Sequence, residues 1–129
     1  MENQKKVILV VEDERPLLGA IKIKLEKNDF EVITARAIDD AKKLASDAKQ
    51  IDAIWLDHYL FGKENGLDFI AWCKNEDNKK CKDIPVFIVS NTASSDKVTT
   101  YMNLGAKKYF VKSNHKLDEI ISDIKDCIS

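Results

Sequence analysis

The chain has few of the residues from which covalent or metal-bound frameworks are built. Its three cysteines, Cys73, Cys81 and Cys127, are an odd number at scattered spacings, and none belongs to a Cys-x-x-Cys motif. The two histidines lie far from any pair of cysteines. The sequence therefore gives no support for a disulfide framework or a cysteine-based metal site. Reduced thiols in a cytoplasm are the interpretation that this pattern favours.

Long apolar runs and an excess of one charge are also missing. No apolar stretch is long enough to cross a bilayer, and the polar N-terminus does not resemble a signal peptide. The 21 basic and 22 acidic residues leave a formal charge of -1, which gives no support for direct contact with nucleic acid. A length of 129 residues with 44% hydrophobic residues suits one domain. We therefore expect a single cytoplasmic domain over residues 1–129 that binds neither nucleic acid directly nor a membrane.

What the chain does contain is a regular alternation of apolar runs and amphipathic stretches. The apolar runs predict strands at residues 7–11, 30–35, 53–56, 85–90 and 108–112. Helical spacing of apolar residues predicts helices at 15–28, 38–49, 66–75 and 95–104, and a last helix capped by Ser113 or Asn114. Five strands that alternate with five helices predict an α/β fold, a doubly wound parallel sheet covered by helices on both faces.

The first predicted strand runs directly into three carboxylates, Glu12, Asp13 and Glu14. Like charges this close repel one another, and the repulsion grows when water is removed. A positive group is therefore expected beside them, and Mg²⁺ prefers such oxygen ligands. Taken alone, the cluster is better explained as a solvated acidic turn that caps the first helix, because acidic residues favour a helix N-terminus.

Three of the other predicted strands also end in chemically distinctive residues, namely Asp57, Ser90 and Lys112. The carboxyl ends of parallel strands meet at one edge of the sheet, where doubly wound folds bind their ligands. An aspartate there can attack phosphorus and form an acyl phosphate. A hydroxyl and an ammonium group can hold the phosphoryl oxygens. The second strand, which ends near Ala35 and Arg36, contributes nothing obvious.

Four segments, VILVVEDE, DAIWLDHYL, IPVFIVSNT and GAKKYFVKS, resemble in this order the receiver domain of two-component response regulators. The resemblance covers nearly the whole chain and implies the flavodoxin-like, CheY-like fold with strand order 2-1-3-4-5. It implies Asp57 as the phosphoacceptor and Lys112 as the lysine that holds the phosphoryl group. It also implies that Ser90 is the hydroxyl that moves toward that group and that Tyr109 is the aromatic switch. The metal ligands that it implies for Mg²⁺ are Glu12, Asp13, Asp57 and the backbone carbonyl of Tyr59.

The same resemblance implies a signalling switch rather than an enzyme in the usual sense. Such a domain takes a phosphoryl group from a sensor histidine kinase or a histidine phosphotransfer protein. It catalyses only its own phosphorylation and slow dephosphorylation. The change is expected to reach a downstream protein target, not identified by the sequence, through the surface of the fourth helix, fifth strand and fifth helix, which includes Met102, Lys107, Lys108 and Tyr109. The expected state is a monomer or a weak dimer.

The sequence departs from the family pattern at several positions around the expected site. Phe61 stands where a proline is usual, and Gly66 comes one residue later than in the commonest pattern, so the loop after Asp57 is expected to follow a different path. Asn91 replaces a small residue, and we hypothesise that it alters the rate of autodephosphorylation. Ser113 replaces a proline that often follows a cis bond, so no cis peptide is expected there. His58, beside Asp57, is expected to be an exposed loop residue.

Two other functional classes stay open at this point. A small-molecule phosphatase with an aspartyl nucleophile would require a second aspartate two residues after Asp57, where Tyr59 stands, and a cap-sized insertion that the sequence lacks. A receiver-like protein-binding module that is never phosphorylated is the other. The complete set of Asp57, Ser90 and Lys112 argues against it, whereas Asn91 is compatible with it.

Overall fold

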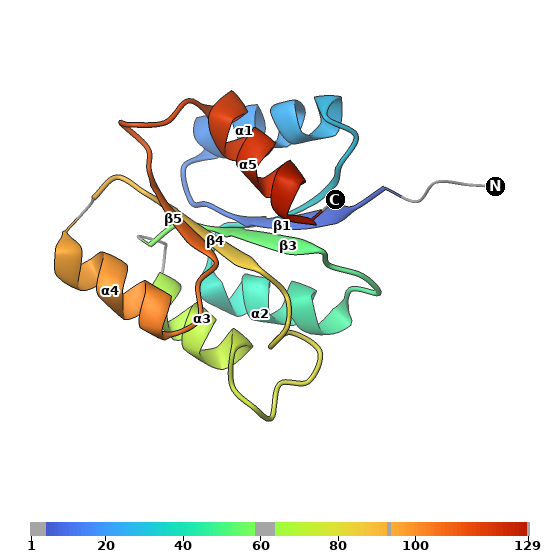
Figure 1. Ribbon diagram of the computed structural model, residues 1–129. Helices are drawn as coiled ribbons and strands as arrows, with labels where there is room; N and C mark the ends of the chain where they lie inside the picture. The colour runs from blue at the N-terminus through green and yellow to red at the C-terminus, as the bar shows by residue number, and fades with distance from the viewer. Residues whose placement is uncertain (1–4, 59–63, 93, 129) are drawn as a thin grey trace.

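The centre of the molecule is a parallel β-sheet. The structure, a computed structural model, describes residues 5–58, 64–92 and 94–128. In this part of the chain, five parallel strands form one sheet in the order β2-β1-β3-β4-β5 (Figure 1). The strands are β1 (Val7–Val11), β2 (Glu31–Ala35), β3 (Ala53–Leu56), β4 (Val86–Ser90) and β5 (Lys108–Val111). The predicted doubly wound fold and its strand order are confirmed.

Helices cover both faces of the sheet. In Figure 1, α1 (Arg15–Lys27) and α5 (Leu117–Ile128) lie on one face, above the sheet in this view. The helices α2 (Ile38–Asp47), α3 (Gly66–Cys73) and α4 (Ser95–Asn103) lie on the other. All five predicted helices are present, with ends that differ from the predicted ones by a few residues. Within the described ranges, no helix combines the length and the apolar character needed to cross a membrane.

The two faces of the sheet bury separate sets of apolar side chains. Every residue of β1 is buried, as expected for a central strand covered on both sides. Leu9 and Val11 join the cluster beneath α2, α3 and α4, whereas Ile8 and Val10 join the cluster beneath α1 and α5. This alternation follows from the two-residue period of a strand. It fixes which way each residue at the strand ends points.

The ends of α4 and α5 show where local sequence signals succeed and fail. Ser94 caps α4, because its side chain accepts a hydrogen bond from the backbone N–H of Lys97 at 3.3 Å. Gly105, with φ +106°, follows the end of α4 in a conformation that favours glycine. The predicted cap of α5 at Ser113 or Asn114 is wrong, because these residues form a turn after β5 and the helix begins at Leu117.

The chain around Ser113 is otherwise as the sequence suggests. No peptide bond in the described residues is cis. At the true start of α5, the backbone N–H of Lys116 donates to the carboxylate of Glu119 at 2.9 Å. This contact provides an acceptor for an N–H at the helix start, the role that the predicted cap was expected to play.

Candidate functional site

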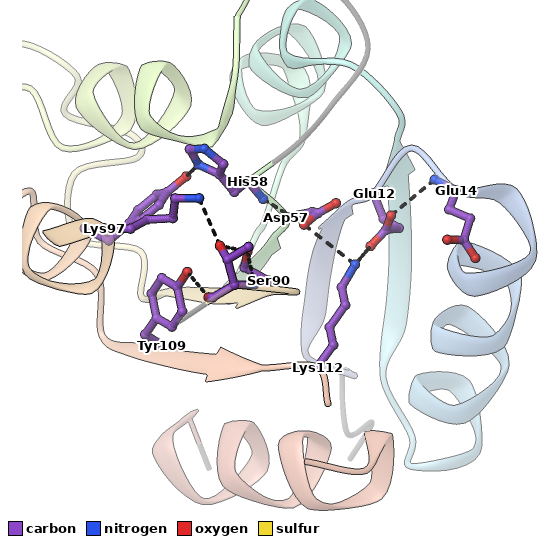
Figure 2. Close-up of polar contacts among 10 residues, drawn as sticks. Glu12, Glu14, Asp57, His58, Ser90, Lys97, Tyr109 and Lys112 are labelled. Atoms are coloured by element: carbon purple, nitrogen blue, oxygen red, sulfur yellow. Dashed lines mark hydrogen bonds and ion pairs between the residues drawn. The ribbon is translucent and has the colours of Figure 1, made fainter. Parts of the chain in front are cut away.

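Strand pairing brings the predicted site residues to one edge of the sheet. Val11 of β1 is paired with Leu56 of β3, so the residues that follow them, Glu12 and Asp57, lie side by side. The backbone N–H of Asp57 donates to the carbonyl of Val11 at 3.0 Å. On the other side of β3, the backbone N–H of Lys112, directly after β5, donates to the carbonyl of Ser90 at the end of β4 at 2.8 Å. Figure 2 shows Glu12, Asp57 and Lys112 converging, with Ser90 nearby.

Three carboxylates form the acidic part of this site. One oxygen each from Glu12, Asp13 and Asp57 can be chosen so that all lie within 4.8 Å of one another. Glu12 and Asp57 are almost completely buried, with exposed fractions of 1% and 5%. Hard oxygen ligands at this spacing fit a divalent cation such as Mg²⁺. The predicted fourth ligand, the carbonyl of Tyr59, and the departure at Phe61 lie outside the described residues.

Lys112 supplies the positive charge that the acidic cluster requires. Its ammonium nitrogen lies 2.9 Å from Oε1 of Glu12 and 3.6 Å from Oδ1 of Asp57 (Figure 2). The same Oδ1 accepts a hydrogen bond from the backbone N–H of His58 at 2.8 Å. The lysine and this N–H therefore stabilise the ionised form of Asp57.

The carboxyl of Asp57 nevertheless holds its proton more tightly than an ordinary aspartate. Burial raises its pKa from 3.8 to about 7, and the negative charge of Glu12 adds to this effect. Lys112 and the N–H of His58 lower the pKa but do not compensate fully, and Asp13 raises it slightly further. A cation bound by these carboxylates would act in the opposite direction, because it favours their charged forms.

The predicted switch residues, Ser90 and Tyr109, both contact Thr92. Ser90 is fully buried, and its Oγ accepts a hydrogen bond from the backbone N–H of Thr92 at 3.4 Å. Tyr109 donates its hydroxyl to the carbonyl of Thr92 at 2.7 Å, and Lys97 donates to the Thr92 hydroxyl at 2.9 Å (Figure 2). Asn91, next to Ser90, is exposed. Thr92 thus connects the neighbourhood of Ser90 to Tyr109.

His58 is buried, so the expectation of an exposed loop histidine is wrong. Only 6% of it is exposed, and its Nδ1 lies 2.6 Å from the hydroxyl of Tyr101, a fully buried residue of α4. Burial lowers the pKa of His58, and the positive charge of Lys97 acts in the same direction. Tyr101 follows His58 by 43 residues in the chain, and nothing near His58 in the sequence signals this contact.

Gly66 allows this arrangement because its side chain is a single hydrogen. Its backbone N–H donates to the carbonyl of His58 at 3.1 Å. A Cβ atom at this position would lie 2.8 Å from the carbonyl oxygen of Asp57 and would clash with the hydroxyl of Tyr101. The start of α3 can therefore approach the site closely only with glycine here.

The second strand also contributes to the site, contrary to the sequence-based expectation. Arg36, directly after β2, donates two hydrogen bonds to the backbone carbonyl of Asp13, from Nε at 3.0 Å and from Nη2 at 2.9 Å. The guanidinium group therefore holds the main chain of the acidic turn. The position of Arg36 directly after a predicted strand indicates that it lies at this edge of the sheet. Its acceptor is a backbone carbonyl, however, and no sequence pattern identifies that partner.

These features together define a class of protein. A flavodoxin-like sheet that gathers three carboxylates, a lysine and a buried serine at the carboxyl ends of its strands is the arrangement of a CheY-like domain. The model of the response regulator receiver domain family matches residues 8–125, and the chain belongs to this family.

Curated relatives and solved structures agree with this assignment. The chain is 33% identical over 105 residues to the phosphate regulon transcriptional regulatory protein PhoB of Klebsiella pneumoniae, covering 81% of this chain and 44% of that protein. It is 28% identical over 108 residues to the transcriptional regulatory protein VxrB of Vibrio cholerae, covering 84% of this chain and 40% of that protein. The chain thus spans less than half the length of these relatives.

Two solved structures extend the comparison to three dimensions. The non-phosphorylated HemR receiver domain from Leptospira biflexa is 29% identical with a TM-score of 0.84, covering 97% of this chain and 95% of that one. The phosphorylated cyanobacterial phytochrome response regulator RcpA is 26% identical with a TM-score of 0.79, covering 96% of this chain and 91% of that one. By their names, the first is a receiver domain and the second a response regulator, in agreement with the family assignment.

Proposed function

We propose that this protein is a phosphoacceptor that takes a phosphoryl group from a sensor histidine kinase or a histidine phosphotransfer protein onto Asp57. The observation that carries the proposal is the position of Asp57. Its carboxylate lies among Glu12, Asp13 and the ammonium group of Lys112, which is 3.6 Å from its Oδ1. A solvated acidic turn would not bury Glu12 and Asp57 beside a lysine that follows another strand.

In the proposed reaction, an oxygen of Asp57 attacks the phosphorus of a phosphohistidine. An O–P bond forms, the P–N bond breaks, and the departing imidazole nitrogen is left neutral or takes a proton from solvent. Lys112 and Ser90 hold oxygens of the transferred group, which is mainly positioned and electrostatically stabilised in such reactions. Glu12, Asp13 and Asp57 would hold Mg²⁺, which supplies positive charge to the phosphoryl oxygens.

We propose that the modified site acts on the surface formed by α4, β5 and α5. Thr92 supports this route because it contacts Ser90 on one side and accepts the hydroxyl of Tyr109 on the other. The ring of Tyr109 also packs against Tyr101 of α4, with centroids 5.9 Å apart. Met102, on the same helix, is 42% exposed. Phosphorylation would favour a conformation that the unmodified chain adopts less often.

The remaining parts of the proposal concern the protein as a whole. We propose that residues 1–129 form a single receiver domain that acts in the cytoplasm as a monomer or weak dimer. Its output would pass through contact with a protein target rather than directly through nucleic acid or a membrane. It would catalyse only its own phosphorylation and dephosphorylation.

The test is an intact-mass measurement after incubation with acetyl phosphate, with and without Mg²⁺. We expect one added phosphoryl group on the wild-type protein with Mg²⁺ and none on the Asp57→Ala variant. The matched control is Asp47→Ala, which removes an exposed carboxylate at the end of α2 and should leave the adduct unchanged.

An adduct that forms equally on Asp57→Ala would contradict the proposed phosphoacceptor. If no adduct forms, a titration with beryllofluoride followed by NMR distinguishes fast hydrolysis from lack of binding. Shifts around Asp57 would support the proposal, whereas an unchanged spectrum would favour a constitutive protein-binding module.

A further inference from the structure

His58 connects the acidic site to two helices on one face of the sheet. Its backbone N–H donates to Oδ1 of Asp57 at 2.8 Å (Figure 2). Its carbonyl accepts from the N–H of Gly66, the first residue of α3, at 3.1 Å. Its Nδ1 lies 2.6 Å from the hydroxyl of Tyr101 on α4. The residue directly after the proposed phosphoacceptor is therefore held both by its main chain and by its side chain.

The contact between His58 and Tyr101 is closed to water. Only 6% of His58 and none of Tyr101 is exposed, and the two rings lie edge to face with centroids 5.6 Å apart. A hydrogen bond in such surroundings is electrostatically stronger than one in water, because water does not compete for either group. The side chain of His58 is therefore tied to α4 more firmly than an exposed contact would hold it.

Close packing fixes the hydroxyl of Tyr101 from other sides as well. A Cβ atom at Gly66 would clash with this hydroxyl, so the start of α3 passes directly beside it. The ring of Tyr101 also packs against Tyr109 of β5, with centroids 5.9 Å apart. The hydroxyl therefore cannot move away from His58 unless α4 shifts or the ring leaves this packing.

This connection is separate from the one through Thr92, which involves the hydroxyl of Tyr109. Tyr101 instead reaches Oδ1 of Asp57 through the backbone of His58. If Tyr101 only filled space, its ring would suffice and its hydroxyl would be dispensable. A hydroxyl placed against the residue that follows Asp57 indicates a role in holding that residue.

We propose that Tyr101 is a positioning residue for Asp57. Its hydrogen bond with His58 keeps the backbone N–H of His58 against Oδ1, and this N–H in turn restricts rotation of the carboxylate. One consequence rests on the proposed function: a carboxylate that is held in place attacks phosphorus faster than one that rotates, because more of its orientations are productive. The positioning itself does not depend on that function.

The first test measures hydrogen exchange by NMR on the ¹⁵N-labelled full chain, without Mg²⁺ or a phosphoryl donor. Tyr101→Phe removes the hydroxyl and keeps the ring. We expect it to lower the protection of the His58 N–H roughly two- to tenfold, the worth of one hydrogen bond. The N–H of Glu12 donates to the carbonyl of Ala35 at 3.0 Å at the same edge of the sheet. It should keep its protection and serves as the internal reference.

Thr100→Val is the matched control on the same helix. It removes the hydroxyl of an exposed residue, which donates to the carbonyl of Asp96 at 2.8 Å, and it should leave the protection of the His58 N–H unchanged.

A pair of variants at position 58 tests the hydrogen bond from its other side. His58→Asn keeps a polar atom near the place of Nδ1, whereas His58→Leu keeps none. The backbone N–H at this position should stay within about twofold of its wild-type protection in His58→Asn and should lose roughly two- to tenfold in His58→Leu. That difference would show that hydrogen bonding, and not the volume of the side chain, holds the N–H.

The second test measures phosphorylation by intact mass at several concentrations of acetyl phosphate, with Mg²⁺ in excess. Tyr101→Phe should lower the maximal rate of adduct formation roughly two- to tenfold. It should leave the half-saturating concentration of acetyl phosphate unchanged, because the position of Asp57 affects the transfer and not the binding of the donor. Thr100→Val should match the wild-type protein in both quantities.

The positioning role is overturned if the His58 N–H keeps its protection in Tyr101→Phe. It is also overturned if the Glu12 N–H loses as much, because Tyr101 would then only stabilise the whole fold, or if His58→Asn and His58→Leu give equal protection. A wild-type maximal rate in Tyr101→Phe would overturn the consequence for phosphorylation. If the wild-type protein forms no adduct, the proposed function fails, but the exchange measurements still decide the positioning role, so the two failures are distinguishable.

Discussion

The raised pKa of Asp57 predicts that this residue destabilises the unmodified protein at neutral and higher pH. The folded protein binds the proton of Asp57 with a pKa of about 7, whereas the ordinary value is 3.8. Between these values the folded state binds more protons than the unfolded state, so stability falls as pH rises through this window. Below about pH 4 the effect is absent, and above about pH 7 it is complete. At about 1.4 kcal/mol per pH unit, the full cost is about 4 kcal/mol.

Asp57→Asn removes the titrating group but keeps an oxygen that can accept the N–H of His58. We expect the variant to be more stable than the wild-type protein by up to about 4 kcal/mol above pH 7, and by little at pH values near 4. Urea unfolding followed by circular dichroism at about pH 5 and about pH 8 measures this difference. Groups shared by the two proteins largely cancel in the comparison. Asp47→Asn, at an exposed position, should change stability by less than about 0.5 kcal/mol at either pH.

Magnesium provides an independent check of the same reasoning. A cation held by Glu12, Asp13 and Asp57, as proposed, would bind only the folded state, and at a hundredfold excess over its dissociation constant it would stabilise that state by about 2.7 kcal/mol. Adding Mg²⁺ at about pH 8 should therefore reduce the advantage of Asp57→Asn. The pH comparison without Mg²⁺ decides the argument. If the free energies of unfolding of the wild-type protein and of Asp57→Asn differ by the same amount at about pH 5 and at about pH 8, the buried carboxyl is not the source of the difference and the reasoning is refuted.

Two further predictions concern the close packing and the charge around the site. Gly66→Ala should destabilise the protein by about 1–3 kcal/mol, because its Cβ would clash with the hydroxyl of Tyr101, whereas Gly19→Ala in α1, with no atom within 4 Å of the new Cβ, should stabilise it by about 0.5–1 kcal/mol. Urea unfolding of both variants decides this, and effects of the same sign would contradict it. Lys112→Met should raise the pKa of Asp57 above about 7, because the lysine charge lowers it. An NMR titration of the Asp57 carboxyl carbon measures this pKa, and a decrease would show that the ion pair has been misassigned.

The fold could be predicted because its signals are local. The run Val7–Val11 contains no polar residue, as a strand buried on both faces requires, and the helices show apolar residues at helical spacing. Given a parallel sheet, the convergence of Glu12, Asp57 and Lys112 follows from the positions of strand ends alone. The pairing of Lys112 with Glu12 then accounts for the three carboxylates that end the first strand.

What could not be predicted depends on contacts between distant parts of the chain or on the path of a connection. The burial of His58 requires Tyr101 of α4, and the role of Arg36 requires the carbonyl of Asp13, 23 residues earlier. The late start of α5 results from the turn that follows β5, although Ser113 and Asn114 are both good capping residues. In each case the local sequence allows several outcomes, and tertiary packing selects one.

The ion pair between Glu12 and Lys112 joins residues that are 100 positions apart. During synthesis, the acidic turn after β1 leaves the ribosome long before the lysine has been made. Until β5 pairs with β4, the growing chain has its carboxylates but lacks the ammonium group beside them. Under the proposed function, the phosphoacceptor site would therefore be incomplete in such a chain, and phosphorylation would be restricted to molecules that have finished folding.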